Sequence, residues 1–480
     1  MGWKDPHARF FLLLLGIGIA AFWLPRLPGS FWTDETVTAW VTDGSFREML
    51  DRAVSFQATP PTYYVLAWAV RLVDGESEIA LRMPSLLAMG LALCLLYRLG
   101  RRLFDAEVGI VAAVVLAIWN EGAHLATDAR PYAIGVLLFV ASTLSLVRWL
   151  DEGHTRHVVA YVALAALVVY VHYVLAAALP AHAVYIWRRR SDLPSRSAAV
   201  IGSAAFVFVL APLVPHLLTV LEQRAALSLG MQSIGATLLV IAPPTLLAGM
   251  AAGIALTRGR LKLEDASAPR PGALALMGTW AAGPPLLLFA ASWIGGAGVL
   301  GPQHVTQSAP ALALLAASAI RRLGPARARR ILLVTIAIVS LLFGASRRQY
   351  GDDWRGAIAR SNGYVDASTP VLVRSGLAES GDVDWLRDDG RGRYLLAPVN
   401  VYPTKGTPVL LPYDLGPAER GYLESEVVPI AESSERFAVI ALAVDDAVLP
   451  WLQGRLGGSG YSLRRLERFG SVTFALFERV

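Results

Sequence analysis

Residues 10–35 read FFLLLLGIGIAAFWLPRLPGSFWTDE, an apolar run followed by a turn with two prolines and then by two adjacent acidic residues. The run is apolar enough to enter a bilayer, so Asp34 and Glu35 would lie close to the membrane surface. Charged side chains at that depth are costly unless they form ion pairs or have a function. The pair therefore needs a structural or a chemical role.

The composition is that of a multi-span membrane protein. Of the 480 residues, 55% are hydrophobic and 17% are charged, which is a more apolar balance than soluble proteins of this size have. The net charge of +6 is spread over short basic clusters between apolar segments. This pattern indicates membrane orientation, not nucleic-acid binding. The single cysteine, Cys94, excludes an intrachain disulfide and a cysteine-based metal site.

The apolar segments predict an α-helical polytopic protein with about eleven transmembrane helices. The first, residues 10–24, contains an Ala20-Ala21 pair that would suit a signal-peptide cleavage site. Bulky residues follow that pair, so we expect a retained helix. The other spans are expected near residues 79–98, 107–119, 132–150, 158–171, 174–187, 198–218, 236–257, 272–294, 305–320 and 331–345.

The segments between and after the apolar runs predict the orientation of the protein, a long first loop and a C-terminal domain. Arginine clusters such as Arg188-Arg189-Arg190 lie on one side, so the N-terminus is predicted inside and the C-terminal region outside. Residues 26–78 are expected to be a long outer loop with interfacial helical segments at 36–53 and 61–73. The transmembrane domain is then 1–345, and 346–480 is predicted to be a small extracytoplasmic α/β domain. Its β-rich runs are 371–373, 394–397, 409–411, 437–442 and 472–477.

This topology places several polar groups on the outer face: Asp34-Glu35, Arg82, Arg130 with Tyr132, and His172-Tyr173. Each has a simpler explanation by itself. Thr33 or Asp34 would cap the helix that follows, and Glu35 would favour its positive end. The arginines would anchor at lipid headgroups, and the histidine would be a turn residue. Together, however, the groups suit a reaction on a phosphate-bearing lipid, because arginines bind phosphate and a carboxylate can take a proton from an attacking hydroxyl.

An ordered set of segments resembles the GT-C membrane glycosyltransferases, and within them the glycosyltransferase 39 or ArnT-like group related to protein O-mannosyltransferases. No single segment is specific, but their order over residues 10–360 is. The segments are Trp32-Thr33-Asp34-Glu35, Pro60-Pro61-Thr62-Tyr63-Tyr64, Ala80-Leu81-Arg82-Met83-Pro84-Ser85, Ala129-Arg130-Pro131-Tyr132-Ala133, Val171-His172-Tyr173 and Asp353-Trp354-Arg355-Gly356-Ala357.

The resemblance implies an enzyme of the cytoplasmic membrane whose active site lies on the extracytoplasmic face. It would move a hexosyl or pentosyl group from a polyprenyl-phosphate donor, held among membrane lipids, to a protein, glycan or lipid acceptor. Asp34 would act as base with Glu35 beside it. The substrate contacts implied are Arg82 and Arg130 for the donor phosphate, with Tyr132, His172, Tyr173 and His304. Some members bind a divalent metal, for which the candidate ligands here are Asp34, Glu35 and His172.

The chain departs from the family pattern at two places. Thr59-Pro60-Pro61 stands where members often have His-Pro-Pro, and Gln303-His304 stands where Arg-Tyr is common. His304 is a candidate substitute for the missing arginine. A flippase of lipid-linked sugars and a non-catalytic scaffold are the alternatives to an enzyme. Related halves and mid-membrane charges, which transporters often show, are not evident in the sequence.

Overall fold

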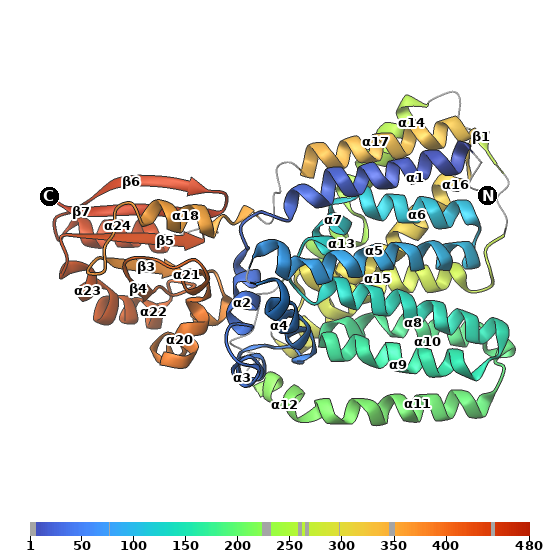
Figure 1. The fold of residues 1–480 in the computed structure, drawn as a ribbon, viewed down its shortest axis with the longest axis horizontal. Coiled ribbons are helices and arrows are strands. Elements are labelled where there is room, and N and C mark those ends of the chain that lie inside the picture. Colours follow the sequence, from blue (N-terminus) through green and yellow to red (C-terminus); the bar gives the residue numbers. More distant parts are fainter. Residues whose placement is uncertain are drawn as a thin grey trace.

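The computed structural model describes residues 6–75, 77–222, 232–257, 262–264, 268–296, 298–344, 351–442 and 447–480. Over these residues the chain forms a helical bundle, a layer of helices from the first loop, and a C-terminal α/β domain. The three parts follow one another along the long axis of the molecule (Figure 1). The predicted boundary at 345/346 lies outside the described residues.

The bundle consists of apolar helices that pack around one large hydrophobic core (Figure 1). Its helices are α1 (Pro6–Gly18), α5 (Glu78–Leu103), α6 (Ala106–Ile118), α7 (Asn120–Ala126), α8 (Tyr132–Glu152), α9 (Thr155–Val171), α10 (Pro180–Arg188), α11 (Arg196–Leu210), α12 (Val214–Glu222), α13 (Ile234–Ile241), α14 (Pro244–Leu256), α15 (Ala273–Gly295), α16 (Ala309–Arg321) and α17 (Ala326–Gly344).

Fewer helices than expected are long enough to cross a membrane. In the described part of the chain five helices meet the requirements of length and apolarity, or seven if each of two bent pairs is one span. Sequence analysis predicted about eleven. One cause is visible at residues 174–187, where the chain first forms a 3-10 segment, Tyr173–Ala178, and becomes α-helical only at Pro180. Proline starts a helix readily because it lacks the N–H that a first turn leaves unused.

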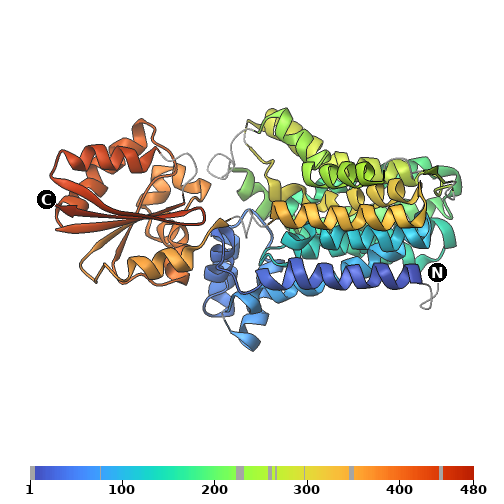
Figure 2. The same cartoon turned by 90° about the horizontal axis from the view of Figure 1, so that it is seen from above.

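The first loop forms three helices that lie between the bundle and the C-terminal domain (Figures 1 and 2): α2 (Thr33–Val41), α3 (Phe46–Phe56) and α4 (Thr62–Asp74). The single helix predicted at 36–53 is thus two helices. They are separated at Gly44, which has a φ of 97°, a conformation that glycine adopts without strain. Ser45 then caps α3 through a capping box with Glu48.

The C-terminal domain contains a five-stranded sheet of order β4-β3-β5-β7-β6, with helices on both faces (Figure 2). Four predicted β-runs are strands: β3 (Pro370–Arg374), β4 (Thr407–Leu410), β5 (Arg436–Leu442) and β7 (Val472–Arg479). The first three are parallel, and β7 pairs antiparallel with β5 and with β6 (Tyr461–Phe469). The helices are α18 (Trp354–Ser361), α19 (Val383–Arg387), α20 (Asp389–Leu395), α21 (Ala397–Val401), α22 (Pro417–Tyr422), α23 (Val428–Glu432) and α24 (Val448–Gly457).

One predicted β-run in this domain was wrong and one strand was not predicted, for a common reason. The run 394–397 lies in helices α20 and α21, and the edge strand β6 was missed. Strand β6 carries charged side chains on an exposed edge, which edge strands commonly do, whereas 394–397 is apolar because it is buried in the core. Hydrophobicity therefore indicated burial correctly but not the type of element.

The loop layer and the C-terminal domain share a single hydrophobic core. Trp40 and Tyr63 from the loop belong to the same buried cluster as Leu372 and Phe437 from the sheet. The opposite face of the sheet packs against α18 in a separate cluster. The C-terminal domain is therefore joined to the segment that carries Asp34 by apolar packing as well as by the polar contacts described below.

Candidate functional site

A cavity of about 380 Å³ lies where the bundle, the loop layer and the C-terminal domain meet. Six of the eight predicted site residues line it: Asp34, Arg130, Tyr132, His172, Tyr173 and His304. Glu35 and Arg82 do not. Glu379, Tyr394 and Tyr413 of the C-terminal domain also line the cavity, and sequence analysis did not identify them.

Asp34 and Arg130 face each other at the cavity. Nη2 of Arg130 lies 3.7 Å from Oδ2 of Asp34, and the aspartate side chain is 24% exposed. Nη1 of Arg130 donates to the hydroxyl of Tyr64 at 3.2 Å and to the backbone carbonyl of Asp34 at 3.4 Å. Its Nε is buried without a hydrogen-bond partner among the described residues. Such a group is expensive to leave unsatisfied, so this guanidinium can still bind an anion.

The environment of Asp34 makes it a better base than a free carboxylate. Burial raises the pKa of Asp34, the Arg130 guanidinium lowers it, and the neighbouring Glu35 raises it again, with a net increase. A higher pKa brings a carboxylate closer to the proton affinity that general-base catalysis needs near neutral pH. The nearby guanidinium still favours the ionised form that accepts a proton.

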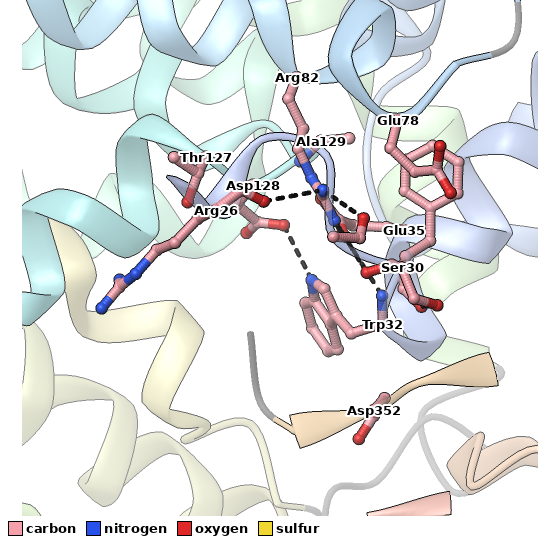
Figure 3. A network of polar contacts seen from close by, with 12 residues as sticks. Arg26, Ser30, Trp32, Glu35, Glu78, Arg82, Thr127, Asp128, Ala129 and Asp352 are labelled. Carbon is pink, nitrogen blue, oxygen red and sulfur yellow. Dashed lines mark hydrogen bonds and ion pairs between the residues drawn. The ribbon is translucent and has the colours of Figure 1, made fainter. Parts of the chain in front are cut away.

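Glu35 and Arg82 form a buried ion pair behind the cavity (Figure 3). Oε1 of Glu35 accepts from Arg82 Nε at 2.8 Å and from the backbone N–H of Ala129 at 2.7 Å. Oε2 accepts from Arg82 Nη2 and from the backbone N–H of Trp32. Arg82 also donates to the carbonyls of Arg26, Leu27, Gly29 and Ser30.

The geometry does not support the predicted contact between Arg82 and the donor phosphate. Its side chain is fully buried, and all five of its N–H donors have protein acceptors. Glu35 likewise has no oxygen facing the cavity. Both residues therefore position the loop, and Glu35 fixes the start of the helix that carries Asp34.

The start of α2 is held by side chains from distant parts of the chain. Phe31 N–H donates to the hydroxyl of Tyr402 at 2.9 Å, and Trp32 N–H donates to Glu35. Thr33 donates to Oδ2 of Asp352 with its N–H at 3.2 Å and its hydroxyl at 3.3 Å.

The helix cap differs from the one predicted. Trp32 is the N-cap residue, and its backbone N–H donates to Oε2 of Glu35 at 3.2 Å, whereas Thr33 or Asp34 was expected to cap; the indole of Trp32 has no acceptor to complete a capping box. The capping contacts thus do not involve the Asp34 carboxylate, which can face the cavity.

An aromatic group forms another wall. The rings of Tyr132 and His172 stack with centroids 5.5 Å apart, and the ring of His304 lies 5.6 Å from His172 at 64°. Nδ1 of His304 lies 2.7 Å from the carbonyl of Val299 and must donate to it, which leaves Nε2 as an acceptor. Burial lowers the pKa of His304 to about 4, so at neutral pH its ring is uncharged and does not replace the charge of an arginine.

Glu379 is the functional candidate that sequence analysis missed. It lies in a 3-10 turn, Ala378–Gly381, directly after β3 and is 8% exposed. The hydroxyl of Tyr394 donates to its Oε1 at 2.8 Å. Burial raises the pKa of Glu379 to about 7. A short turn has no periodicity, so the only available signal was an acidic residue among small and apolar ones.

Comparisons with known proteins bear on the fold. The family model described as dolichyl-phosphate-mannose-protein mannosyltransferase matches residues 58–218. ArnT from Cupriavidus metallidurans superposes with a TM-score of 0.56 when bound to undecaprenyl phosphate and 0.57 in the apo state, at 11% identity. The alignments cover 98% of this chain and 97% and 98% of ArnT, respectively. The chain has the GT-C fold.

A second GT-C structure agrees. The arabinofuranosyltransferase AftD from Mycobacteria gives a TM-score of 0.50 at 14% identity, covering 98% of this chain and 40% of AftD. No curated protein sequence matches the chain. The family match includes Arg130 and His172 but ends before His304 and Glu379. The residues that the C-terminal domain contributes to the cavity of this GT-C fold therefore lie outside the family match.

The residues present do not form the predicted metal site. Asp34 and His172 line the cavity, but both oxygens of Glu35 are taken by Arg82 and by backbone N–H groups. Across the described residues, no three His, Cys, Asp or Glu side chains are grouped so that they could hold a metal ion. We therefore derive no step of the reaction through a metal.

Proposed function

We propose that this GT-C protein is a glycosyltransferase that moves a sugar from a polyprenyl-phosphate donor to an acceptor hydroxyl. The observation that carries the proposal is the pairing of Asp34 with Arg130 in one cavity, with a buried guanidinium N–H that lacks a partner among the described residues. The fold is shared with ArnT, which has been crystallised with undecaprenyl phosphate.

The two residues divide the work of one displacement. The acceptor hydroxyl gives its proton to Asp34 and attacks the anomeric carbon while the bond from that carbon to the phosphate oxygen breaks. The phosphate leaves with additional negative charge, which Arg130 stabilises. A single displacement inverts the anomeric centre, so a β-linked donor gives an α-linked product.

The placement of the cavity supports a reaction at one membrane face. The cavity lies at the end of the bundle next to the loop layer and the C-terminal domain. Arg102 and Arg189, from the basic loops, both pair with Asp151 at the end of α8 away from Arg130. By the positive-inside rule, the protein then lies in the cytoplasmic membrane with its active site on the extracytoplasmic face.

The alternatives are less well supported. A scaffold gives no reason to bring Asp34 and Arg130 together in a cavity. A flippase would be expected to carry charged groups at mid-membrane depth, whereas Asp34 lies in α2 of the loop layer and Arg130 lies just before the first residue of α8.

The test uses the full-length protein in lipid nanodiscs. Labelled polyprenyl-phosphate sugars are purified from a strain that lacks the gene, and unlabelled envelope vesicles of that strain supply the acceptor. Asp34→Asn should lose at least about a hundredfold of the transfer rate, as expected for a general base. Asp51→Asn, which changes an exposed carboxylate of the same loop layer, should transfer normally. Full activity of Asp34→Asn would refute the proposal.

Mass analysis of the envelope glycans, glycolipids and glycoproteins of the same strain would then identify the sugar and the acceptor. Their modification should be lost in the strain and restored by the wild-type gene, but not by the Asp34→Asn gene.

A further inference from the structure

The C-terminal domain supplies a wall of the cavity, through residues 376–379, Tyr394 and Tyr413. Glu379 is near enough to the reacting groups that Asp34 raises its pKa and Arg130 lowers it. A carboxyl group that shares a cavity with the base and with the phosphate-binding arginine has access to the substrates. The role inferred below for Glu379 rests on the proposed glycosyltransferase function and adds an acceptor subsite to it.

Glu379 differs from the structural carboxylate Glu35 in its partners. Glu35 is satisfied by a guanidinium and two backbone N–H groups. Glu379 receives hydrogen bonds only from its own backbone N–H and from the neutral hydroxyl of Tyr394, and it forms no ion pair within the described part of the chain. Burying a carboxylate with so few donors is costly. A ligand that brings hydrogen-bond donors would satisfy it.

Aromatic rings hold the Glu379 carboxyl in place. The ring of Tyr394 stacks on Phe56 with a centroid distance of 5.7 Å and an interplanar angle of 9°, and Trp40 lies edge-on to both. Phe56 and Tyr394 both line the cavity. A sugar ring has apolar C–H faces that pack on aromatic rings and hydroxyls that donate to carboxylates, and this wall offers both kinds of contact.

The charges select against an anionic acceptor. Of the described cavity-lining side chains, Asp34 and Glu379 carry carboxyls and Arg130 carries the guanidinium. If Arg130 neutralises the donor phosphate, a phosphorylated or acidic acceptor would meet two carboxyls without a compensating cation. Repulsion between like charges is stronger in a partly dry cavity than in water, so it opposes the binding of such an acceptor. A neutral hydroxylated group avoids this cost.

We propose that Glu379, supported by Tyr394, forms the acceptor subsite and accepts a hydrogen bond from a hydroxyl of a neutral sugar headgroup. The hydroxyl that attacks the donor gives its proton to Asp34, and a second hydroxyl of the same sugar donates to Glu379. Glu379 thereby determines acceptor specificity without taking part in bond breaking. The acceptor is a glycan or glycolipid headgroup.

The experiment separates acceptor binding from donor binding. Glu379→Gln in nanodiscs should need about tenfold more envelope vesicles for half-maximal transfer, the loss expected for one hydrogen bond to a charged group. Its affinity for undecaprenyl phosphate should stay within about twofold of wild type. Tyr394→Phe should show a smaller loss of the same kind, and Glu379→Asp should recover part of the activity. Glu435→Gln, which changes an exposed carboxylate of the same domain, should match wild type in both assays.

Treatment of the vesicles identifies the class of acceptor. Periodate, which destroys vicinal diols of sugars, should abolish acceptor activity, whereas digestion with proteinase should leave it intact. Loss of activity after proteinase alone would show a protein hydroxyl as acceptor and overturn the proposal. Normal transfer by Glu379→Gln, or a parallel loss of undecaprenyl phosphate binding, would also overturn it. If Asp34→Asn is inactive in the same assay, these outcomes leave the glycosyltransferase function standing.

Discussion

Glu379 should lower the stability of the protein at neutral pH, because a buried carboxylate whose hydrogen-bond donors are all neutral resists ionisation. Its pKa is raised from 4.5 to about 7, chiefly by burial. The hydrogen bonds from its own backbone N–H and from Tyr394, and the charge of Arg130, lower this pKa, and the charge of Asp34 adds to the increase. The other ionisable side chains that line the cavity are Tyr132, His172, Tyr173, His304 and Tyr413.

The sign follows from the two pKa values. The folded state binds the proton more tightly than the unfolded state, so the stability contribution is full below pH 4.5 and is lost as the pH rises towards 7. With 1.36 kcal/mol for each pKa unit, the ionised group costs about 3 kcal/mol at pH 8 and about 1 kcal/mol at pH 5. Glu379→Gln is neutral at every pH and avoids this cost.

Unfolding measured at both pH values tests the prediction. The stability of Glu379→Gln relative to wild type should increase by about 2 kcal/mol between pH 5 and pH 8. A constant effect of the substitution on packing cancels in this difference, and Glu435→Gln should show no such change. A difference between Glu379→Gln and wild type that does not depend on pH would refute the reasoning. The expected result would identify Glu379 as a residue that is retained in spite of its effect on stability, as binding-site residues often are.

Three further changes test the parts around the cavity. Glu35→Gln leaves the buried guanidinium of Arg82 uncompensated and should cost about 3–5 kcal/mol in chemical unfolding. Asp43 of the same layer pairs with Arg71 at 2.7 Å, and its side chain is 60% exposed, so Asp43→Asn should cost about 0–1 kcal/mol. Equal effects would contradict the burial of the first pair. Arg130→Lys should weaken undecaprenyl phosphate binding by about tenfold in a titration, because an ammonium cannot form the paired bonds of a guanidinium, and unchanged affinity would place the phosphate elsewhere. Gly470→Ala would put a Cβ 1.4 Å from the carbonyl of Gly351 at a φ of 62°, so it should lower both the thermal midpoint and the transfer rate, while Gly457→Ala, which has no atom within 4 Å, should change neither.

Sequence reasoning placed several polar groups near one another from the predicted topology alone, and the structure brings them to one cavity. Asp34, Arg130 and His172 were predicted on one membrane face, and all three line one cavity. These residues lie where apolar segments end, and the ends of apolar segments can be identified directly from the sequence. The GT-C fold was likewise predicted from the order of short sequence segments.

The roles of the two arginines could not be distinguished from sequence. Arg82 and Arg130 both occupy the outer start of an apolar helix, so they looked equivalent. The difference comes from residues 26–30, whose carbonyls converge on Arg82 and occupy its donors. Which guanidinium remains available to a ligand depends on such long-range packing, and no local pattern encodes it. Glu379 was missed for the same reason, since the role proposed for it depends on its contact with Tyr394 and on its position in the cavity.

The division of the chain into a catalytic membrane part and an appended domain does not describe how the site is built. Three successive backbone N–H groups precede Asp34, and two of their acceptors, Tyr402 and Asp352, come from beyond the bundle. Asp352 is itself held by the hairpin of β6 and β7, where it bridges to Gly470. Each unsatisfied N–H would cost about 1–3 kcal/mol, so the C-terminal region fixes the first turn of α2 and with it the proposed base, Asp34. Because the same region supplies Glu379, the base and the proposed acceptor subsite are set by one packed unit, and a shift of the C-terminal domain would move both.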